Sequence, residues 1–194
     1  MKIGFVGTGR MGNPISQSLL KAGFQLMVAD VNKEAYQNLI AMGAKAGASP
    51  FEVGQQAELV MTSLPKDEIV QEVIAGPNGI LEGAKPGSII LDLSTTSPQT
   101  IRQIGREAAR RGIDFLDTPV SGGVRKAKNG TLSIMAGGDK RVFEKVKFVL
   151  ERIGKNIFQL YFFHAFADSL QVRHKELAHG FIFLCTIARI HLFR

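Results

Sequence analysis

Three glycines near the start of the chain have the spacing of a turn that can hold a pyrophosphate. The stretch Gly7-Thr8-Gly9-Arg10-Met11-Gly12 follows the apolar run 2–6 and precedes a helical pattern of apolar residues. Gly7 permits a tight turn, Gly9 lets the backbone approach a phosphate, and Gly12 allows a helix to pack closely on a strand. The N-terminus of that helix adds free N–H groups and positive potential. The motif predicts a dinucleotide site; the alternative is a glycine turn in an α/β protein without a ligand.

A carboxylate after the next strand-like run selects between two dinucleotides. Asp30 follows the run 25–29, at the distance from the glycines where a carboxylate accepts hydrogen bonds from ribose hydroxyls. Its charge would repel the 2'-phosphate of NADP, whose usual partner is an arginine, and the next residue is Val31. Lys33 is the close cation that could soften this preference. We therefore expect NAD(H) as the cofactor in preference to NADP(H).

Three further loops carry residues that could contact a ligand. In a doubly wound sheet, ligands lie outside the carboxyl ends of the strands, so the loops that follow strands are the ones to examine. We expect a proline there to fix the backbone near the cofactor and hydroxyls to bond ribose or carboxamide groups, with N-capping of the next helix as their alternative. The candidates are Leu64 and Pro65 after the run 59–62, Ser94, Thr95 and Thr96 after 89–91, and Ser121, Gly122 and Gly123 after 113–116.

The last of these loops has the chemistry of a carboxylate-binding turn. Two successive glycines, Gly122 and Gly123, bring backbone N–H groups close to a ligand, and the hydroxyl of Ser121 adds another donor. The alternative is an ordinary glycine turn that leads into residues 126–130.

Apolar runs alternate with helical patterns along the chain, which predicts an α/β fold with a mostly parallel sheet covered on both faces. Ser97 and Pro98 are expected to begin a helix, and Gly43, Gly112 and Gly154 stand where C-terminal caps belong. The expected strands are 2–6, 25–29, 44–46, 58–63, 88–92, 113–117, 131–136 and 156–159, and the clearest helices are 12–22, 33–42, 66–75, 98–111 and 139–152.

The amino-acid composition limits the classes of function that this chain could have. The chain has 194 residues, 45% of them hydrophobic, which is ample for one core. The net charge is +7, but the lysines and arginines are scattered among acidic residues along the expected helices. We therefore expect no nucleic-acid partner. The absence of a secretory pattern and the single cysteine, Cys185, favour the cytoplasm. The apolar runs 158–167 and 181–188 are too short to span a membrane, and the histidines lack metal-ligand spacing, so we expect no membrane anchor and no metal.

The motifs together resemble those of the β-hydroxyacid dehydrogenases, which include 3-hydroxyisobutyrate dehydrogenase and tartronate semialdehyde reductase and are similar in fold to 6-phosphogluconate dehydrogenase. The resemblance covers residues 1 to about 157. It rests on residues 4–12, Leu64-Pro65, 83–87, 117–123 and 130–139.

The resemblance implies a Rossmann-type domain that binds NAD, and hydride transfer between the nicotinamide and the terminal carbon of a 3-hydroxy acid or its semialdehyde. It implies that Ser121, Gly122 and Gly123 hold the carboxylate of a small substrate, and that Thr95 and its neighbours lie near the nicotinamide. Full-length members also have a helical C-terminal domain that supports a homo-oligomer. We expect this chain to lack that domain, and its oligomeric state is left open.

The family's catalytic lysine, in a Gly-x-x-x-Lys-x-x-x-Asn pattern, is missing from this sequence. It would fall near Ser169, where no such pattern exists. Lys175 is the alternative proton donor, but it lacks the flanking glycine and asparagine. Two functions therefore stay open: the cofactor-binding part of an oxidoreductase, or a non-catalytic NAD-binding module with an interaction tail.

Residue types change abruptly after residue 157. The segment 158–194 holds all four histidines and the single cysteine, but only one of the 21 glycines, Gly180. It also holds seven of the 13 phenylalanines: Phe158, Phe162, Phe163, Phe166, Phe181, Phe183 and Phe193. We expect a cofactor-binding domain over 1–157, followed by an unrelated reading frame that arises from a frameshift, an alternative splice or a gene-model error.

The coding DNA tests this expectation directly. Translation of all three forward frames across codons 150–180 and beyond should reveal, in another frame, the missing lysine pattern followed by a long helical domain. If no frame contains it, residues 158–194 are the intended product and the frameshift hypothesis is wrong.

Overall fold

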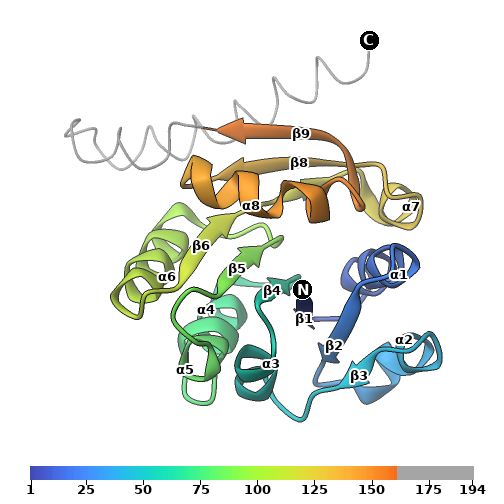
Figure 1. Ribbon diagram of the computed structural model, residues 1–194, viewed down its shortest axis with the longest axis horizontal. Helices are drawn as coiled ribbons and strands as arrows, with labels where there is room; N and C mark the ends of the chain where they lie inside the picture. The colour runs from blue at the N-terminus through green and yellow to red at the C-terminus, as the bar shows by residue number, and fades with distance from the viewer. Residues whose placement is uncertain (161–194) are drawn as a thin grey trace. The chain divides into compact units, whose positions relative to one another are not determined.

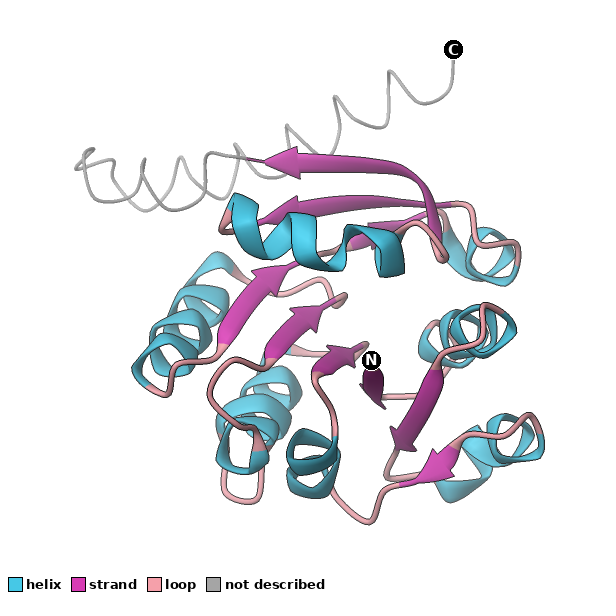
Figure 2. Ribbon diagram, in the orientation of Figure 1, coloured by secondary structure: helices cyan, strands magenta, loops and turns pink. Residues whose placement is uncertain are grey.

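Six parallel strands form the part of the sheet that positions the predicted site. The computed structural model describes residues 1–160, which form a nine-stranded sheet with helices on both faces (Figures 1 and 2). The parallel strands lie in the order β3-β2-β1-β4-β5-β6, which is the order of a doubly wound dinucleotide-binding sheet. They are β1 (Lys2–Val6), β2 (Gln25–Ala29), β3 (Lys45–Ala46), β4 (Leu59–Thr62), β5 (Ile89–Asp92) and β6 (Asp114–Asp117).

Alternation along the strands divides the core into two layers. Leu59 and Met61 on β4 pack in one cluster of buried side chains, whereas Val60 between them packs in the other. Because successive side chains of a strand point to opposite faces, apolar residues at every position bury both faces of the sheet. This is why the central strands are continuous apolar runs.

The helices are divided between the two faces in the same way. Buried residues of α1, α2 and α8 belong to the first cluster, and those of α3, α4, α5 and α6 belong to the second. The helices are α1 (Gly12–Lys21), η1 (Lys33–Tyr36, a 3₁₀ turn), α2 (Gln37–Ala41), α3 (Pro50–Gln56), α4 (Asp67–Ala75), α5 (Ile80–Gly83), α6 (Pro98–Arg110), α7 (Gly123–Lys128) and α8 (Lys140–Leu150). The doubly wound fold class predicted from the sequence is confirmed.

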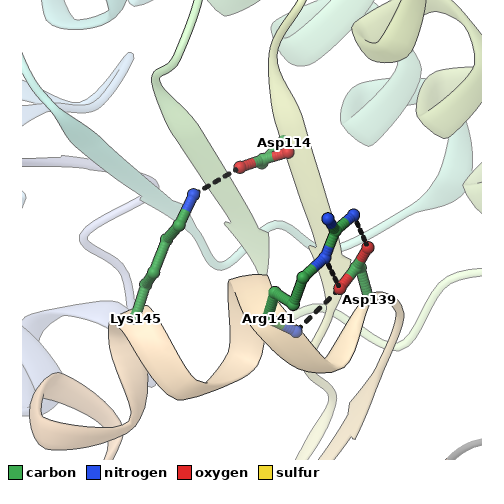
Figure 3. A network of polar contacts seen from close by, with 4 residues as sticks. All are labelled: Asp114, Asp139, Arg141 and Lys145. Carbon is green, nitrogen blue, oxygen red and sulfur yellow. Dashed lines mark hydrogen bonds and ion pairs between the residues drawn. The ribbon is translucent and has the colours of Figure 1, made fainter.

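Three strands beyond β6 extend the sheet. Strand β8 (Leu132–Gly137) is antiparallel to β6 and to the short β7 (Val120–Ser121), and β9 (Gly154–Leu160) runs parallel to β8. Figure 3 shows how α8 is tied to β6, through an ion pair of 3.4 Å between Lys145 and Asp114. At the start of α8, the Asp139 carboxylate accepts hydrogen bonds from the backbone and guanidinium of Arg141, and these lower its pKa to about 2.

Two of the three predicted glycine caps and the predicted start of α6 are confirmed. The Ser97 hydroxyl accepts a hydrogen bond from the backbone N–H of Thr100, and Pro98 occupies the first turn. Gly43 and Gly112 follow α2 and α6 with φ of +100° and +67°. Gly154 is a wrong prediction, because α8 already ends at Leu150 and Gly154 begins β9, paired with Leu132.

Short elements are where the sequence reading fails. The predicted helix 33–42 is a 3₁₀ turn followed by five α-helical residues. Helices α3, α5 and α7 and strand β7 were not predicted, because each has seven residues or fewer and shows too little periodicity. Within the part of the chain that is described, no helix has the length and apolarity needed to cross a membrane.

Candidate functional site

The carboxyl ends of five parallel strands lie at one level. A single row of neighbouring residues crosses the sheet there: Ala29, Val6, Thr62, Asp92 and Asp117. Each loop that the sequence singles out leaves the sheet just after this row. The register therefore brings the glycine turn, the Asp30 loop and the loops after β4, β5 and β6 to the same edge, as the sequence predicts.

The glycine turn has the backbone that its motif requires. Gly7 has φ of +90°, which side-chain-bearing residues rarely adopt, and a Cβ atom on Gly12 would lie 1.9 Å from the carbonyl oxygen of Gly7. Around Gly9, by contrast, a Cβ atom would meet nothing within 4 Å. Helix α1 begins at Gly12 without a side-chain cap. The Asn13 N–H donates to the Gly9 carbonyl oxygen and Pro14 has no N–H, so the donors suited to a phosphate are the N–H groups of residues 10–12.

Asp30 is locked at the end of β2. One carboxylate oxygen accepts a hydrogen bond of 2.7 Å from the backbone N–H of Thr8, and the other accepts one of 2.9 Å from the N–H of Asn32. The first of these joins the carboxylate directly to the glycine turn. The partly exposed carboxylate keeps lone pairs available for a ligand, in a fixed position relative to Gly9.

A cavity of about 1050 Å³ lies between the loops after β1, β2, β3 and β4. It has the size and the mixed apolar and polar lining of a cofactor site. Of the predicted site residues, those that line it are Gly7, Gly9, Arg10, Met11, Asp30, Leu64 and Pro65. Lys33 lines it as well, close to Asp30 in sequence. The donors, the carboxylate and the open approach at Gly9 fit a dinucleotide.

The three hydroxyl residues after β5 that are predicted to contact a ligand differ in burial and in hydrogen bonding. Ser94 and Thr96 are buried, and both donate hydrogen bonds to the Asp92 carboxylate, at 2.6 and 2.9 Å. Thr95, between them, is exposed. Thr95 is therefore the side chain of this trio that a ligand can reach without displacing an existing hydrogen bond.

The Ser121-Gly122-Gly123 turn is exposed and lies between β7 and α7. Both glycines have positive φ, +127° and +63°, so the turn requires residues without a Cβ atom. The side-chain stem of Lys126 covers Gly122: a Cβ atom there would lie 2.4 Å from its Cδ. This turn does not line the cavity described above. It follows β7, which pairs with β8 beyond the Asp117 end of β6.

The expectations that concern the tail, including the missing lysine near Ser169, Lys175 and the histidines, lie outside the described residues.

A family of known domains matches almost all of the described chain. The family described as the NAD binding domain of 6-phosphogluconate dehydrogenase matches residues 2–161. The chain belongs to this family. The resemblance predicted from the motifs is thereby confirmed, and the glycine turn, Asp30 and the cavity lie within the matched domain.

Relatives of this NAD-binding domain are dehydrogenases and reductases of hydroxy acids. The 2-hydroxy-3-oxopropionate reductase of Escherichia coli strain K12 is 40% identical over 157 residues, which cover 81% of this chain and 53% of the relative. The structure of Mycobacterium tuberculosis 3-hydroxyisobutyrate dehydrogenase with L-serine is 34% identical, with a TM-score of 0.77 over 81% of this chain and 53% of that chain. A structure of Psf3 with NADP+ and 2-OPP is 30% identical, with a TM-score of 0.78 over 81% and 56% of the two chains.

The match is confined to the cofactor-binding half of these enzymes. The chain spans about half the length of the curated relatives it matches. This likeness therefore shows the NAD-binding domain.

Two carboxyl groups at the sheet edge were not assigned a role from the sequence. Asp92 and Asp117 are register partners on β5 and β6, so their side chains point to the same face. Burial of Asp117 and the negative charge of Asp92 raise the pKa of Asp117 to about 8. A strand that ends in aspartate, with hydroxyls two and four residues later, is the signal that could have found Asp92.

The raised pKa of Asp117 predicts a pH dependence of stability. Between its ordinary pKa of 3.8 and about 8, the folded state holds a proton that the unfolded chain releases. Stability should therefore fall as pH rises through this window, by up to about 1.4 kcal/mol per pH unit for this one group. Asp117→Asn should remove this fall and exceed the parent in stability at pH 8, as measured by urea unfolding from pH 4 to 9.

The control is Asp114→Asn, an exposed carboxylate on the same strand that pairs with Lys145. It should leave the parent's fall in stability in place. Identical pH profiles for the parent and Asp117→Asn would contradict the assignment.

Proposed function

We propose that this chain is the cofactor-binding part of an NAD(H)-dependent oxidoreductase of small 3-hydroxy acids or their semialdehydes. The observation that carries the proposal is the locked Asp30 carboxylate beside the open glycine turn, in a chain that belongs to an NAD-binding family. The names of the relatives, which act on hydroxy acids or oxo acids, support the substrate class.

In this proposal the residues divide the dinucleotide between them. Residues 7–12 hold the pyrophosphate and Asp30 holds the adenosine ribose. Leu64 and Pro65 face the cofactor from β4, and Thr95, with its neighbours Ser94 and Thr96, borders the nicotinamide. When bound, the nicotinamide supplies or accepts the hydride.

The substrate carboxylate is proposed to bind at the turn Ser121-Gly122-Gly123. Its backbone N–H groups and the serine hydroxyl are donors, and a ligand can approach at Gly123, where a Cβ atom would meet nothing within 4 Å. The cationic side chain of Lys126 lies over the same turn, which favours an anion there. The proposed partner is thus a small molecule that carries a carboxylate. We propose the cytoplasm as the location of the protein.

A second candidate function is a non-catalytic NAD-binding module. It is favoured by the sequence itself, because the lysine pattern expected near Ser169 is absent. The change in residue types places the boundary between the cofactor-binding domain and the atypical segment at residue 157. Because the family match runs to 161 and β9 to Leu160, we propose that the domain extends to residue 160.

The position of the Asp30 carboxylate predicts that the chain prefers NADH to NADPH. The 194-residue chain should bind NADH at least about tenfold more tightly than NADPH, because the 2'-phosphate would stand against the Asp30 carboxylate. Asp30→Asn should weaken NADH binding by about 10- to 100-fold, because it removes a hydrogen bond to a charged group. It should also reduce the preference for NADH over NADPH. Fluorescence titration of both cofactors measures this.

Asp139→Asn is the matched control, since it removes an exposed carboxylate on α8 and retains an N-cap residue. It should bind both cofactors like the parent. Tighter binding of NADPH than of NADH by the parent chain would refute the assigned preference.

Turnover separates the two candidate functions. With the positioned lysine missing, oxidation of NADH by a panel of semialdehyde acids should be about 10²- to 10⁴-fold slower than in a full-length relative that has it. Saturable oxidation favours the oxidoreductase, and NADH binding without any oxidation favours the binding module. Lys175→Ala should leave any turnover intact; its loss would identify Lys175 as a substitute proton donor.

A further inference from the structure

Asp92 is the most heavily hydrogen-bonded carboxylate at the site edge, and neither the motifs nor the proposed function gives it a role. It is fully buried at the end of β5. Its side chain accepts four hydrogen bonds: from the hydroxyls of Thr62, Ser94 and Thr96 at 2.8, 2.6 and 2.9 Å, and from the backbone N–H of Ser94 at 3.1 Å.

These hydrogen bonds extend to the loop after β4. The hydroxyl of Ser94 donates to Asp92 and accepts a hydrogen bond of 2.9 Å from the backbone N–H of Leu64. Leu64 and Pro65 line the cavity. The position of this wall of the cavity is therefore set by Asp92 through one intervening hydroxyl.

The loop after β6 is attached to the same residue through its backbone. The N–H and the hydroxyl of Thr118 both donate to the Asp92 carbonyl oxygen, at 2.8 and 3.1 Å. Thr118 precedes the turn proposed to hold the substrate carboxylate. Asp92 thus contacts the loops after β5 and β6 directly, and the loop after β4 through Ser94.

The adenosine side of the site does not depend on these contacts. There the Asp30 carboxylate bonds Thr8 and Asn32, within the loops after β1 and β2. The two halves of the site therefore have separate anchors, and each anchor is a carboxylate.

We propose that Asp92 is the positioning residue for the nicotinamide half of the cofactor. It holds Ser94 and Thr96 so that the exposed Thr95 and the Leu64-Pro65 wall keep their places around the ring. This inference rests on the proposed function, because it requires that a nicotinamide dinucleotide occupies the cavity.

A purely structural role for Asp92 makes a different prediction. A buried carboxylate with several donors is costly to alter, because the hydroxyls around it lose their acceptor. If stability were its whole role, a variant would lose affinity for every part of the dinucleotide equally, or for none. A positioning role confines the loss to the nicotinamide half.

The experiment compares NADH with ADP-ribose, which lacks the nicotinamide, on the 194-residue chain. Asp92→Asn should weaken NADH binding about tenfold or more and leave the affinity for ADP-ribose within about twofold of the parent's. The fluorescence enhancement of bound NADH, which reports the surroundings of the nicotinamide, should also fall.

Two milder variants keep the test decisive if Asp92→Asn does not fold. Ser94→Ala removes the link to Leu64, and Thr96→Val removes one donor at nearly constant volume. Both should lower NADH affinity more than ADP-ribose affinity. Ser133→Ala is the matched control, since this buried hydroxyl has no hydrogen-bond partner within residues 1–160, and it should change neither affinity.

The outcomes separate this inference from the proposed function. If the parent binds NADH and the Asp92, Ser94 and Thr96 variants lose NADH and ADP-ribose affinity in parallel, or lose neither, the positioning role is wrong and the proposed function stands. If the parent chain binds no NADH, the proposed function fails, and the inference that rests on it fails as well.

Discussion

The common level at which the parallel strands end is the constraint on which the site depends. Neighbouring strands pair so that Val6, Thr62, Asp92 and Asp117 form one row, and each loop of interest leaves the sheet directly after it. In a sheet buried on both faces, a slip of one residue would turn every side chain to the opposite layer, so packing holds this register firmly. Residues more than 100 positions apart in sequence thereby reach one edge.

Two aspartates, Asp92 and Asp117, lie side by side on that edge, and their burial is compensated to different extents. Asp92 is surrounded by donors, so its burial is compensated by hydrogen bonds. Asp117 beside it has no such set of donors among the described residues, and burial and the neighbouring charge raise its pKa. A row that was apolar throughout would be more stable, but it would offer no fixed acceptor around which the loops could be organised.

Local patterns were sufficient to predict the glycine turn, Asp30 and the central strands, because their signals lie within about 30 residues and follow from backbone geometry. Helix α3 escaped prediction because its seven residues carry only two buried positions, Val53 and Gly54. The hydrogen bond from Thr62 to Asp92 could not be predicted, since Thr62 lies 30 residues away on another strand. In the sequence, a hydroxyl that binds a ligand cannot be distinguished from one that bonds a buried carboxylate. The fold determines which of the two partners the hydroxyl has.

In the proposed arrangement, the two halves of the cofactor site differ in how their loops are held in place. The adenosine side is formed by the first two strands and their loops, whose contacts are close in sequence. The nicotinamide side needs β4, β5 and β6 in register, together with the hydrogen bonds that meet at Asp92. Both carboxylates lie within residues 1–160, which is the part of the chain that the NAD-binding family matches. The carboxylates therefore fix the loops around the cavity, whereas no residue of this part of the chain has been assigned as a proton donor.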